Sequence, residues 1–406
     1  MVIATLIEKI KSIMAKVVDN FKNWWKERKF VFSRYTKDAQ ETQEPERSLL
    51  QLPDAARQKL VKGVENLPSN PADKEVIIST LNEAFEQWQN SPSNTNNSVV
   101  VLSSPITSVS RILTETLQEW TQQKQVAMKL LPLKARPAEI ETVESKLKHY
   151  FEQQSDKKDS DEQLEVAVIP NLGWCFLRSL DGLKGIEYLQ TQLFKNDKKR
   201  FWIIGGGQVG WQYLNSVCAI KAYCGEVFIL PEIEPEKFED WLAPIIEELE
   251  ITFDDPSIDL QLLEGDKDNK TNYFEKLADI SEGVSTVALQ GFLKSIQYEK
   301  VDDDEDDETS PKPKKLVAQV PKLPELPELE SADQYILYSL LLHGDLTISA
   351  LAESLGDAEA EVQARVQLLR QEGVVEEKNK VLKINPIHYP KIQRELAGNN
   401  FIIKKE

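Results

Sequence analysis

Residues 201–211 read Phe-Trp-Ile-Ile-Gly-Gly-Gly-Gln-Val-Gly-Trp, and the interpretation of the whole chain depends on them. An apolar run that fits a buried strand leads into Gly205, Gly207 and Gly210, spaced Gly-x-Gly-x-x-Gly, and then into an amphipathic stretch. A strand, these glycines and a helix in that order form the fingerprint of a dinucleotide-binding turn. Glu232 follows Gly210 by 22 residues, where an acid would bind the ribose of NAD.

The position of the motif argues against a dinucleotide site. A fingerprint strand normally opens its domain, whereas three predicted strand–helix units precede residue 201. Trp211, Leu214 and Cys218 share one face of the following helix, which suits packing against a sheet. We therefore expect the glycines to serve packing and expect no cofactor. If NAD does bind, the residues that would hold it are Gly205, Gly207, Gly210 and Glu232.

Five apolar runs alternate with four amphipathic stretches between residues 98 and 234. The predicted strands are 99–102, 126–131, 166–169, 201–204 and 227–230, and the predicted helices are 108–123, 137–153, 182–194 and 210–222. This alternation predicts an α/β fold with a doubly wound, parallel, five-stranded sheet. Residues 235–298, with helices over 235–250 and 270–297 and no further strand, are interpreted as a helical lid.

The regions on either side of the predicted sheet and lid differ in composition. Residues 38–97 are interpreted as a helical connector, with helices over 53–66 and 71–89. Residues 299–330 contain DDDEDDE (302–308) and a proline-spaced tract, which is typical of an extended acidic linker. Residues 331–401 contain three predicted helices (332–343, 346–355, 357–372) and a hairpin over 374–384, the pattern of a winged helix.

The first predicted strand enters its helix through Ser-Ser-Pro-Ile-Thr-Ser-Val-Ser, residues 103–110, where a phosphate-binding loop would lie. The motif GxxxxGK[ST] places Ser103 and Ser108 at its glycines, Val109 at its lysine and Ser110 at its hydroxyl. The lysine that neutralises phosphate charge and the glycines that expose backbone N–H groups are therefore both missing.

The third predicted strand would end in a magnesium-binding acid in a nucleoside triphosphatase, but it ends in Pro170 and Asn171. We expect no hydrolytic site. Three scattered histidines and three cysteines without a CxxC pair also predict no metal site. If a nucleotide does bind, its candidate contacts are Ser103, Ser108, Ser110, Asn171 and Gln208.

In the order of its elements, the region from about 98 to 401 resembles AAA+-type P-loop ATPases that have lost their catalytic residues. It is similar to uncharacterised bacterial proteins that join such a core to a winged helix. On this resemblance residues 201–214 supply the fourth strand, with Gln208 nearest to an ATP-sensing position, and residues 225–242 supply the fifth strand and the entry to the lid. Residues 280–296 resemble the lid helix that carries a sensor arginine, but they contain only Lys294.

Charge limits the partners of the chain. A net charge of −18 does not suit a general nucleic-acid binder. The predicted groove-reading helix begins with Asp357 and Glu359, so we expect the winged helix to bind a protein rather than DNA. The basic residues on this predicted surface are Arg365, Arg370, Lys378 and Lys380.

Residues 1–37 hold nine Lys and Arg against three Asp and Glu, along one apolar helical stripe. Such a helix suits an anionic membrane surface, the stripe of a partner helix, or packing onto the body of the protein itself. The residues expected to make this contact are Phe21, Lys22, Trp24, Trp25, Lys26 and Arg28. No apolar run reaches the roughly 20 residues that span a bilayer, so we expect a cytoplasmic protein, which is peripheral on the cytoplasmic face of a membrane if this helix binds lipid.

Together these patterns predict a non-catalytic adaptor or scaffold that docks on a membrane or membrane protein through its N-terminal helix. Its degenerate ATPase-like core and winged helix would bind a protein partner. The alternative is a nucleotide-dependent sensor or a winged-helix transcription regulator. A third class, an NAD-linked oxidoreductase, lacks a catalytic His, Cys or Lys in a recognisable motif.

Overall fold

The structure is a computed structural model that describes residues 49–50, 52, 54–91, 96–124, 126–131, 133–152, 164–195, 199–253, 268–299 and 315–401. The predicted basic helix over 1–37 and the acidic run 302–308 lie outside these described residues.

A parallel five-stranded sheet forms the centre of the molecule, in the order β3-β4-β5-β2-β6. Its strands are β2 (Ser98–Ser103), β3 (Ala127–Leu130), β4 (Glu165–Ile169), β5 (Arg200–Gly207) and β6 (Glu226–Ile229). The strand that comes first along the chain thus lies between the last two. This confirms the predicted α/β class and gives the sheet the strand order of P-loop ATPases.

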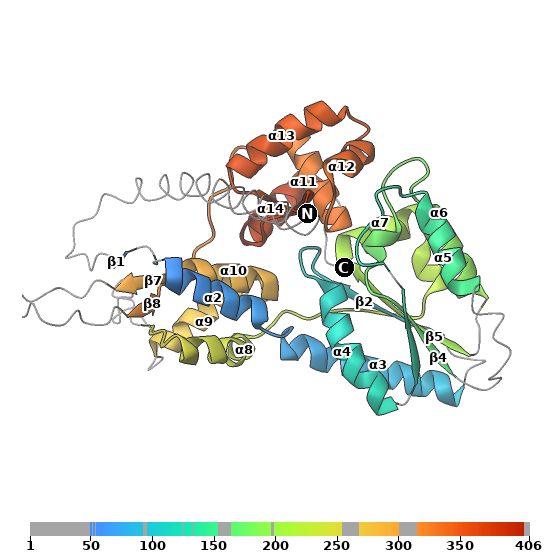
Figure 1. The fold of residues 1–406 in the computed structure, drawn as a ribbon, viewed down its shortest axis with the longest axis horizontal. Helices are drawn as coiled ribbons and strands as arrows, with labels where there is room; N and C mark the ends of the chain where they lie inside the picture. The colour runs from blue at the N-terminus through green and yellow to red at the C-terminus, as the bar shows by residue number, and fades with distance from the viewer. Residues whose placement is uncertain are drawn as a thin grey trace, which may run out of the picture.

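Helices cover both faces of the sheet because its strands present apolar side chains to both (Figure 1). On one face lie α3 (Pro71–Asn90) and α4 (Val109–Lys124), and on the other lie α5 (Thr142–Glu152), α6 (Lys184–Phe194) and α7 (Gln208–Cys218). The expected connector over 38–97 therefore contributes a layer of this core. The reason is the stripe Ile77, Leu81, Phe85 and Trp88, which is fully buried against α4 and the sheet.

The lid combines helices with a small sheet that the sequence did not predict. Its helices are α2 (Asp54–Asn66), α8 (Pro235–Glu248), α9 (Asn269–Ser281) and α10 (Ser285–Ser295). Its strands, antiparallel and in the order β1-β7-β8, are β1 (Leu49–Leu50), β7 (Ile296–Glu299) and β8 (Leu316–Ala318).

Two expectations about the lid were wrong. The single helix over 270–297 is two helices, because Glu282 and Gly283 both take positive φ angles, of 51° and 67°, and break it. The absence of a further strand was also wrong, since β7 pairs with β8, which lies within the expected linker. Burial of Leu316, Val317 and Ala318 against the lid explains why this part of the linker is ordered into a strand.

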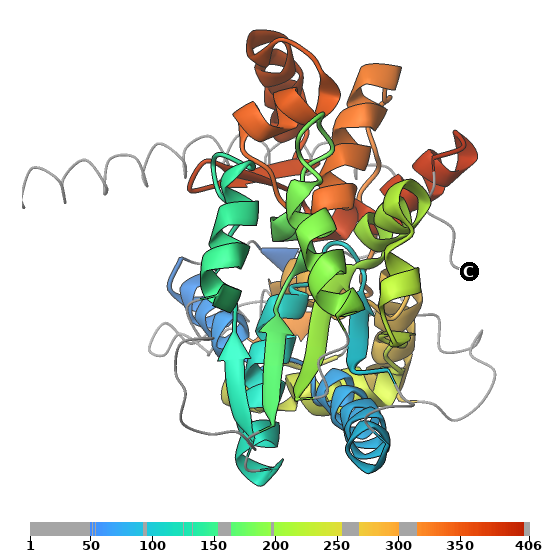
Figure 2. The ribbon, with the colours of Figure 1, turned by 90° about the vertical axis from the view of Figure 1, so that its right-hand side faces the viewer.

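The C-terminal unit, residues 331–401, contains the three predicted helices and the predicted hairpin. Its elements are α11 (Ser331–His343), α12 (Ile348–Leu355), α13 (Glu359–Gln371), β9 (Val375–Lys378), β10 (Val381–Ile384) and α14 (Tyr389–Gly398). Asn379 and Lys380 have φ angles of 54° and 66°, as a two-residue type I′ hairpin turn requires. Figure 2 shows this unit above the edge of the sheet to which the strands point. Across the described part of the chain, no helix has the length and apolar character needed to cross a bilayer.

Candidate functional site

A cleft of about 320 Å³ opens at the carboxyl edge of the sheet, where ligands of open α/β proteins bind. Three parts of the molecule line it: the core, the α9–α10 break of the lid, and α14 of the C-terminal unit. The lining residues are Asp73, Ser103, Ser104, Thr107, Gln208, residues 229–233, residues 282–285, Tyr389 and Gln393. None of these described lining residues is Lys, Arg or His.

The structure brings two of the five candidate nucleotide contacts to this cleft, namely Ser103 and Gln208. Ser108 and Ser110 do not line the cleft; their hydroxyl oxygens lie 3.4 Å apart near the start of α4. Asn171 lies elsewhere, because its side chain accepts a hydrogen bond from the Gly173 amide at 2.9 Å and so begins the short helix η1 (Leu172–Cys175). It lines a separate cavity of about 30 Å³.

The loop between β2 and α4 is folded on its own carbonyl groups. The amide of Thr107 donates to the Ser104 carbonyl at 3.0 Å, and the amide of Val109 donates to the Thr107 carbonyl at 2.9 Å. Pro105 carries no N–H, and Val109, at the position of a phosphate-binding lysine, is 2% exposed. A phosphate would therefore meet neither these amides nor a cation in this loop.

Asp73 is the least expected residue of the cleft. It lies in the first turn of α3 and is only 4% exposed, and burial raises the pKa of its carboxyl group to about 6. The Ala72 amide at the start of α3 is satisfied by the Asn70 side chain at 2.8 Å, so Asp73 does not cap the helix. Among the described residues, the Asp73 carboxylate has no hydrogen-bond or ion-pair partner.

The other two acids of the cleft are Glu232 and Glu282. Glu282 is paired with Arg394 of α14 at 2.8 Å, so its charge is partly compensated across the boundary between the lid and the C-terminal unit. With Asp73, they give the lining an acidic character, which disfavours a phosphate-bearing ligand.

The glycines of residues 205–210 do not form a dinucleotide-binding turn. Strand β5 runs through Gly205 and Gly207, which pair with Val101 and Ser103 of β2, and α7 begins at the next residue. A Cβ atom on Gly205 would lie 2.4 Å from the Pro170 carbonyl oxygen, and one on Gly210 would lie 2.6 Å from that of Leu342 in α11. These glycines therefore allow close backbone contacts.

Glu232, the candidate ribose ligand, lies in the acidic cleft, whereas Gly207 and Gly210 line the smaller cavity beneath α11. The structure does not bring the four residues together around one ligand, which agrees with the packing interpretation of the glycines.

Arg136 joins the core to the C-terminal unit at what we call the interdomain joint. Its side chain is 6% exposed, and burial lowers the pKa of the guanidinium to about 10, so it stays charged at neutral pH. The guanidinium donates to four backbone carbonyls, two in the core and two in the C-terminal unit: Phe176, Gly173, His343 and Asp345. One nitrogen also lies 3.8 Å from the Asp345 carboxylate.

Arg178 and His343 complete the interdomain joint. The Arg178 guanidinium donates to the Ser354 carbonyl at 2.9 Å, and its backbone amide donates to Nε2 of His343 at 3.3 Å. Burial, together with the charges of Arg136 and Arg178, holds the pKa of His343 well below its usual value. The imidazole is therefore neutral and acts as an acceptor.

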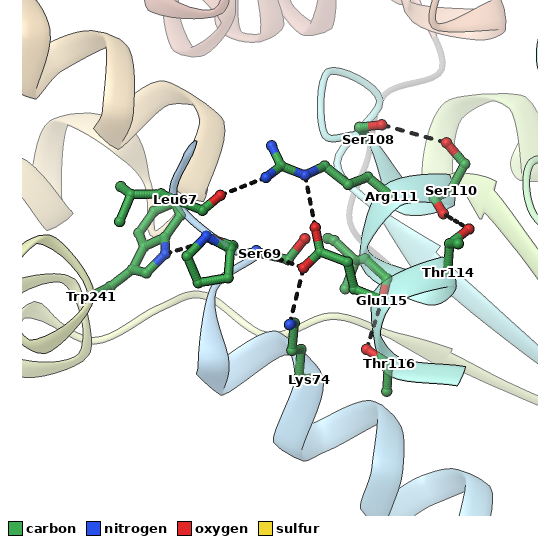
Figure 3. A network of polar contacts seen from close by, with 12 residues as sticks. Leu67, Ser69, Lys74, Ser108, Ser110, Arg111, Thr114, Glu115, Thr116 and Trp241 are labelled. Atoms are coloured by element: carbon green, nitrogen blue, oxygen red, sulfur yellow. Dashed lines mark hydrogen bonds and ion pairs between the residues drawn. The ribbon is translucent and has the colours of Figure 1, made fainter. Parts of the chain in front are cut away.

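A second polar network joins the core to the lid (Figure 3). The Glu115 carboxylate accepts from the Ser69 amide at 2.9 Å and from Arg111 at 2.9 Å, and it lies 3.0 Å from Lys74. Burial alone would raise the pKa of Glu115, but these donors outweigh it and lower the pKa to about 2. Trp241 of the lid donates to the Pro68 carbonyl at 2.9 Å in the same segment.

The basic residues predicted on the C-terminal unit are partly neutralised. Arg365 pairs with Glu330 at 2.5 Å, and Arg370 pairs with Glu377 at 2.8 Å. Lys378 ends β9 and Lys380 lies in the hairpin turn. The six candidate contacts of the N-terminal helix, Phe21 to Arg28, lie outside the described residues.

The strand order and the place of the cleft define the class of the protein: an α/β protein with a sheet of the P-loop ATPase type, a lid and a C-terminal helical unit. No protein-family model matches the sequence, and no curated protein is significantly similar to it.

Solved structures with a similar arrangement exist. Cdc6p from Pyrobaculum aerophilum is 11% identical over 86% of this chain and 99% of its own, with a TM-score of 0.36. The Aeropyrum pernix ORC2 protein in its ADPNP–ADP complexes is 11% identical over 82% and 96%, with a TM-score of 0.38. A chain of the E. coli MS115-1 HORMA:CdnC:Trip13 complex is 13% identical over 59% and 83%, with a TM-score of 0.32. Because all three scores are low, function has to be inferred from the residues of this chain.

Proposed function

We propose that this chain is a non-catalytic scaffold, in which an ATPase-like core and a C-terminal winged helix present surfaces to a protein partner. The observation that carries this proposal is the cleft at the carboxyl edge of the sheet, whose lining has three acids and, among the described residues, no cation. Hydrolysis of a nucleoside triphosphate needs positive charge at the transferred phosphoryl group. The acidic lining of the cleft therefore supports the proposal that the protein does not hydrolyse nucleotides.

An exposed aromatic pair supports a protein-binding role. Phe194 at the end of α6 is 78% exposed and lies 6.5 Å, between ring centroids, from Tyr223 of η2 (Ile220–Tyr223), which is 39% exposed. Aromatic side chains are enriched at protein interfaces because they bury a large area at a low cost in conformational entropy.

The pairing of Arg365 and Arg370 with acids supports a protein partner rather than DNA for the winged helix. DNA binding depends on cations that are free to neutralise phosphates. The rival role, a transcription regulator, predicts that duplex DNA is retained at low salt and released when both arginines are replaced by alanine.

A thermal-shift panel with ATP, ADP, GTP, NAD and NADH, with and without magnesium, tests the proposal. We expect no shift with any of these ligands. A nucleotide at about one hundred times its dissociation constant would stabilise the protein by about 2.7 kcal/mol, and a shift of that size would support the nucleotide-sensor alternative.

The membrane part of the proposal concerns residues 1–37. Deletion of this segment is expected to reduce sedimentation with anionic liposomes and to leave the melting temperature unchanged. A chain in which Trp24 and Trp25 are replaced by serine separates aromatic insertion from simple charge attraction. Equal sedimentation of all three proteins would contradict a tethering role.

A further inference from the structure

The cleft contains a buried carboxylate, in the first turn of α3, that has no partner among the residues the structure describes. Asp73 is 4% exposed, lines the cleft, and has no hydrogen-bond or ion-pair partner among the described residues. Burial of a carboxylate without a partner is unfavourable, and folded proteins generally satisfy such groups. Two other acids at boundaries between parts of the molecule have partners: Glu115 accepts from three donors, and Glu282 of the cleft pairs with Arg394.

The other residues that line the cleft indicate which kind of ligand could pair with the Asp73 carboxylate. Leu230, Pro231, Ile233 and Val284 supply apolar surface, and the side chains of Ser103, Ser104 and Gln208 supply hydrogen-bonding groups. The cleft volume of about 320 Å³ lies in the lower range of small-molecule sites, which are mostly apolar with a few placed polar groups. A small ligand with an apolar part and one positively charged group fits this composition.

Two other ligand classes fit poorly. The described residues contain no group of three His, Cys, Asp or Glu side chains that could hold a metal ion. A phosphate would meet Asp73, Glu232 and Glu282, and the amides of Thr107 and Val109 are already bonded within their loop.

We propose that the cleft binds a small organic cation, an aliphatic amine or guanidine, whose charged head pairs with the Asp73 carboxylate while its hydrocarbon part contacts the apolar lining. An ammonium or guanidinium group supplies the donors that this carboxylate lacks, and a charge-assisted hydrogen bond is about twice as strong as a neutral one. The proposal is independent of the scaffold role, because it concerns a ligand that is not a nucleotide.

Isothermal titration calorimetry on the full chain tests it with agmatine and pentylamine as cationic probes. The neutral analogue 1-pentanol matches pentylamine in size, and adenosine serves as a probe for a neutral nucleobase. We expect agmatine and pentylamine to bind and the two neutral compounds to bind at least about tenfold more weakly, because the charged pair is missing.

Two variants locate the site. Asp73→Asn keeps the shape of the side chain and removes its charge, so it is expected to weaken agmatine binding by about tenfold or more and to raise the melting temperature of the free protein. Glu75→Gln, on the same helix but exposed and 3.9 Å from Lys237, is the matched control and is expected to leave both quantities unchanged. Each variant also reports its own folding through its melting temperature.

The proposal fails if neither cation binds, if Asp73→Asn binds agmatine as tightly as the parent chain, or if adenosine binds as well as pentylamine. None of these results tests the scaffold proposal, which is contradicted instead by a thermal shift with ATP, ADP, GTP, NAD or NADH. Agmatine binding that is lost in Asp73→Asn and retained in Glu75→Gln supports the site.

Discussion

Replacement of Arg136 by methionine is expected to loosen the interdomain joint. Methionine has a similar length but donates no hydrogen bond, so the carbonyls of Phe176, Gly173, His343 and Asp345 all lose a donor. Each buried acceptor left without a partner costs about 1–3 kcal/mol. The full sum is not expected, because the carbonyls gain water once the joint opens and because the desolvation of the guanidinium is removed. A net loss of about 3–5 kcal/mol is the expected range for breaking a buried charged network.

Hydrogen exchange measured by mass spectrometry is the suitable assay, since it reports the opening of α11 and α12 separately from unfolding of the sheet. Arg111→Met is the matched control: Arg111 bonds Glu115 and the Leu67 carbonyl, but its side chain is 50% exposed. We expect this control to cost about 1 kcal/mol or less. The reasoning would be refuted if Arg136→Met left exchange in residues 331–355 unchanged, or if it destabilised the protein no more than Arg111→Met does.

Three further predictions concern the glycine motif and the effect of pH. Gly210→Ala is expected to destabilise the protein by about 1–2 kcal/mol, because its Cβ atom would lie 2.6 Å from the Leu342 carbonyl oxygen. The control Gly206→Ala, whose Cβ atom would have its nearest neighbour at 3.6 Å, is expected to change stability by about 0.5 kcal/mol or less. Equal effects of the two variants in urea denaturation would contradict the packing role of Gly210. Because the pKa of Glu115 is lowered from 4.5 to about 2, its contribution is fully present above pH 4.5 and is lost as the pH falls toward 2. Glu115→Gln should therefore flatten the dependence of the melting temperature on pH in this window, and an unchanged slope would argue against the network of Figure 3. His343 is neutral in the folded protein and takes up a proton near pH 6.5 in the unfolded chain, so its contribution to stability is fully present above pH 6.5 and falls below it. The variant His343→Gln should therefore lose less stability than the parent chain between pH 6.5 and 5. An equal loss in the two proteins would show that His343 does not titrate as described.

Four of the five strands of the central sheet could be predicted from the sequence because each contains a short, continuous apolar run next to amphipathic helices; β3 is also largely apolar, but Lys129 interrupts it. Strands β7 and β8 could not be predicted, because Ile296 pairs with Ala318 on the far side of the acidic run in the sequence, and no local pattern indicates that pairing. The glycines were ambiguous for a related reason: the contact that requires Gly210 is with Leu342, more than one hundred residues away along the chain.

Ser103, Gln208 and Glu232 of the cleft were candidates from the sequence, but Asp73 and the residues of the interdomain joint were missed because their role depends on burial. Asp73 follows Asn70 and Pro71 at the start of a helix, where an acid is common, so only its place in the fold distinguishes it. The Arg136 guanidinium bonds to the Asp345 carbonyl, 209 residues further along, which no periodicity or motif could indicate.

Helix α11 is buried around its whole circumference, from Ile336 to His343, between the core and its own unit. During synthesis on the ribosome, the core is complete about one hundred residues before this helix emerges. The surface around Gly210 and Phe176, which α11 covers in the folded protein, stays exposed during that interval. A nascent chain that stalls before residue 331 would present that apolar surface to other molecules in the cell. The close contact between the core and the C-terminal unit therefore has a cost during synthesis: until α11 has been made, the chain needs protection from aggregation.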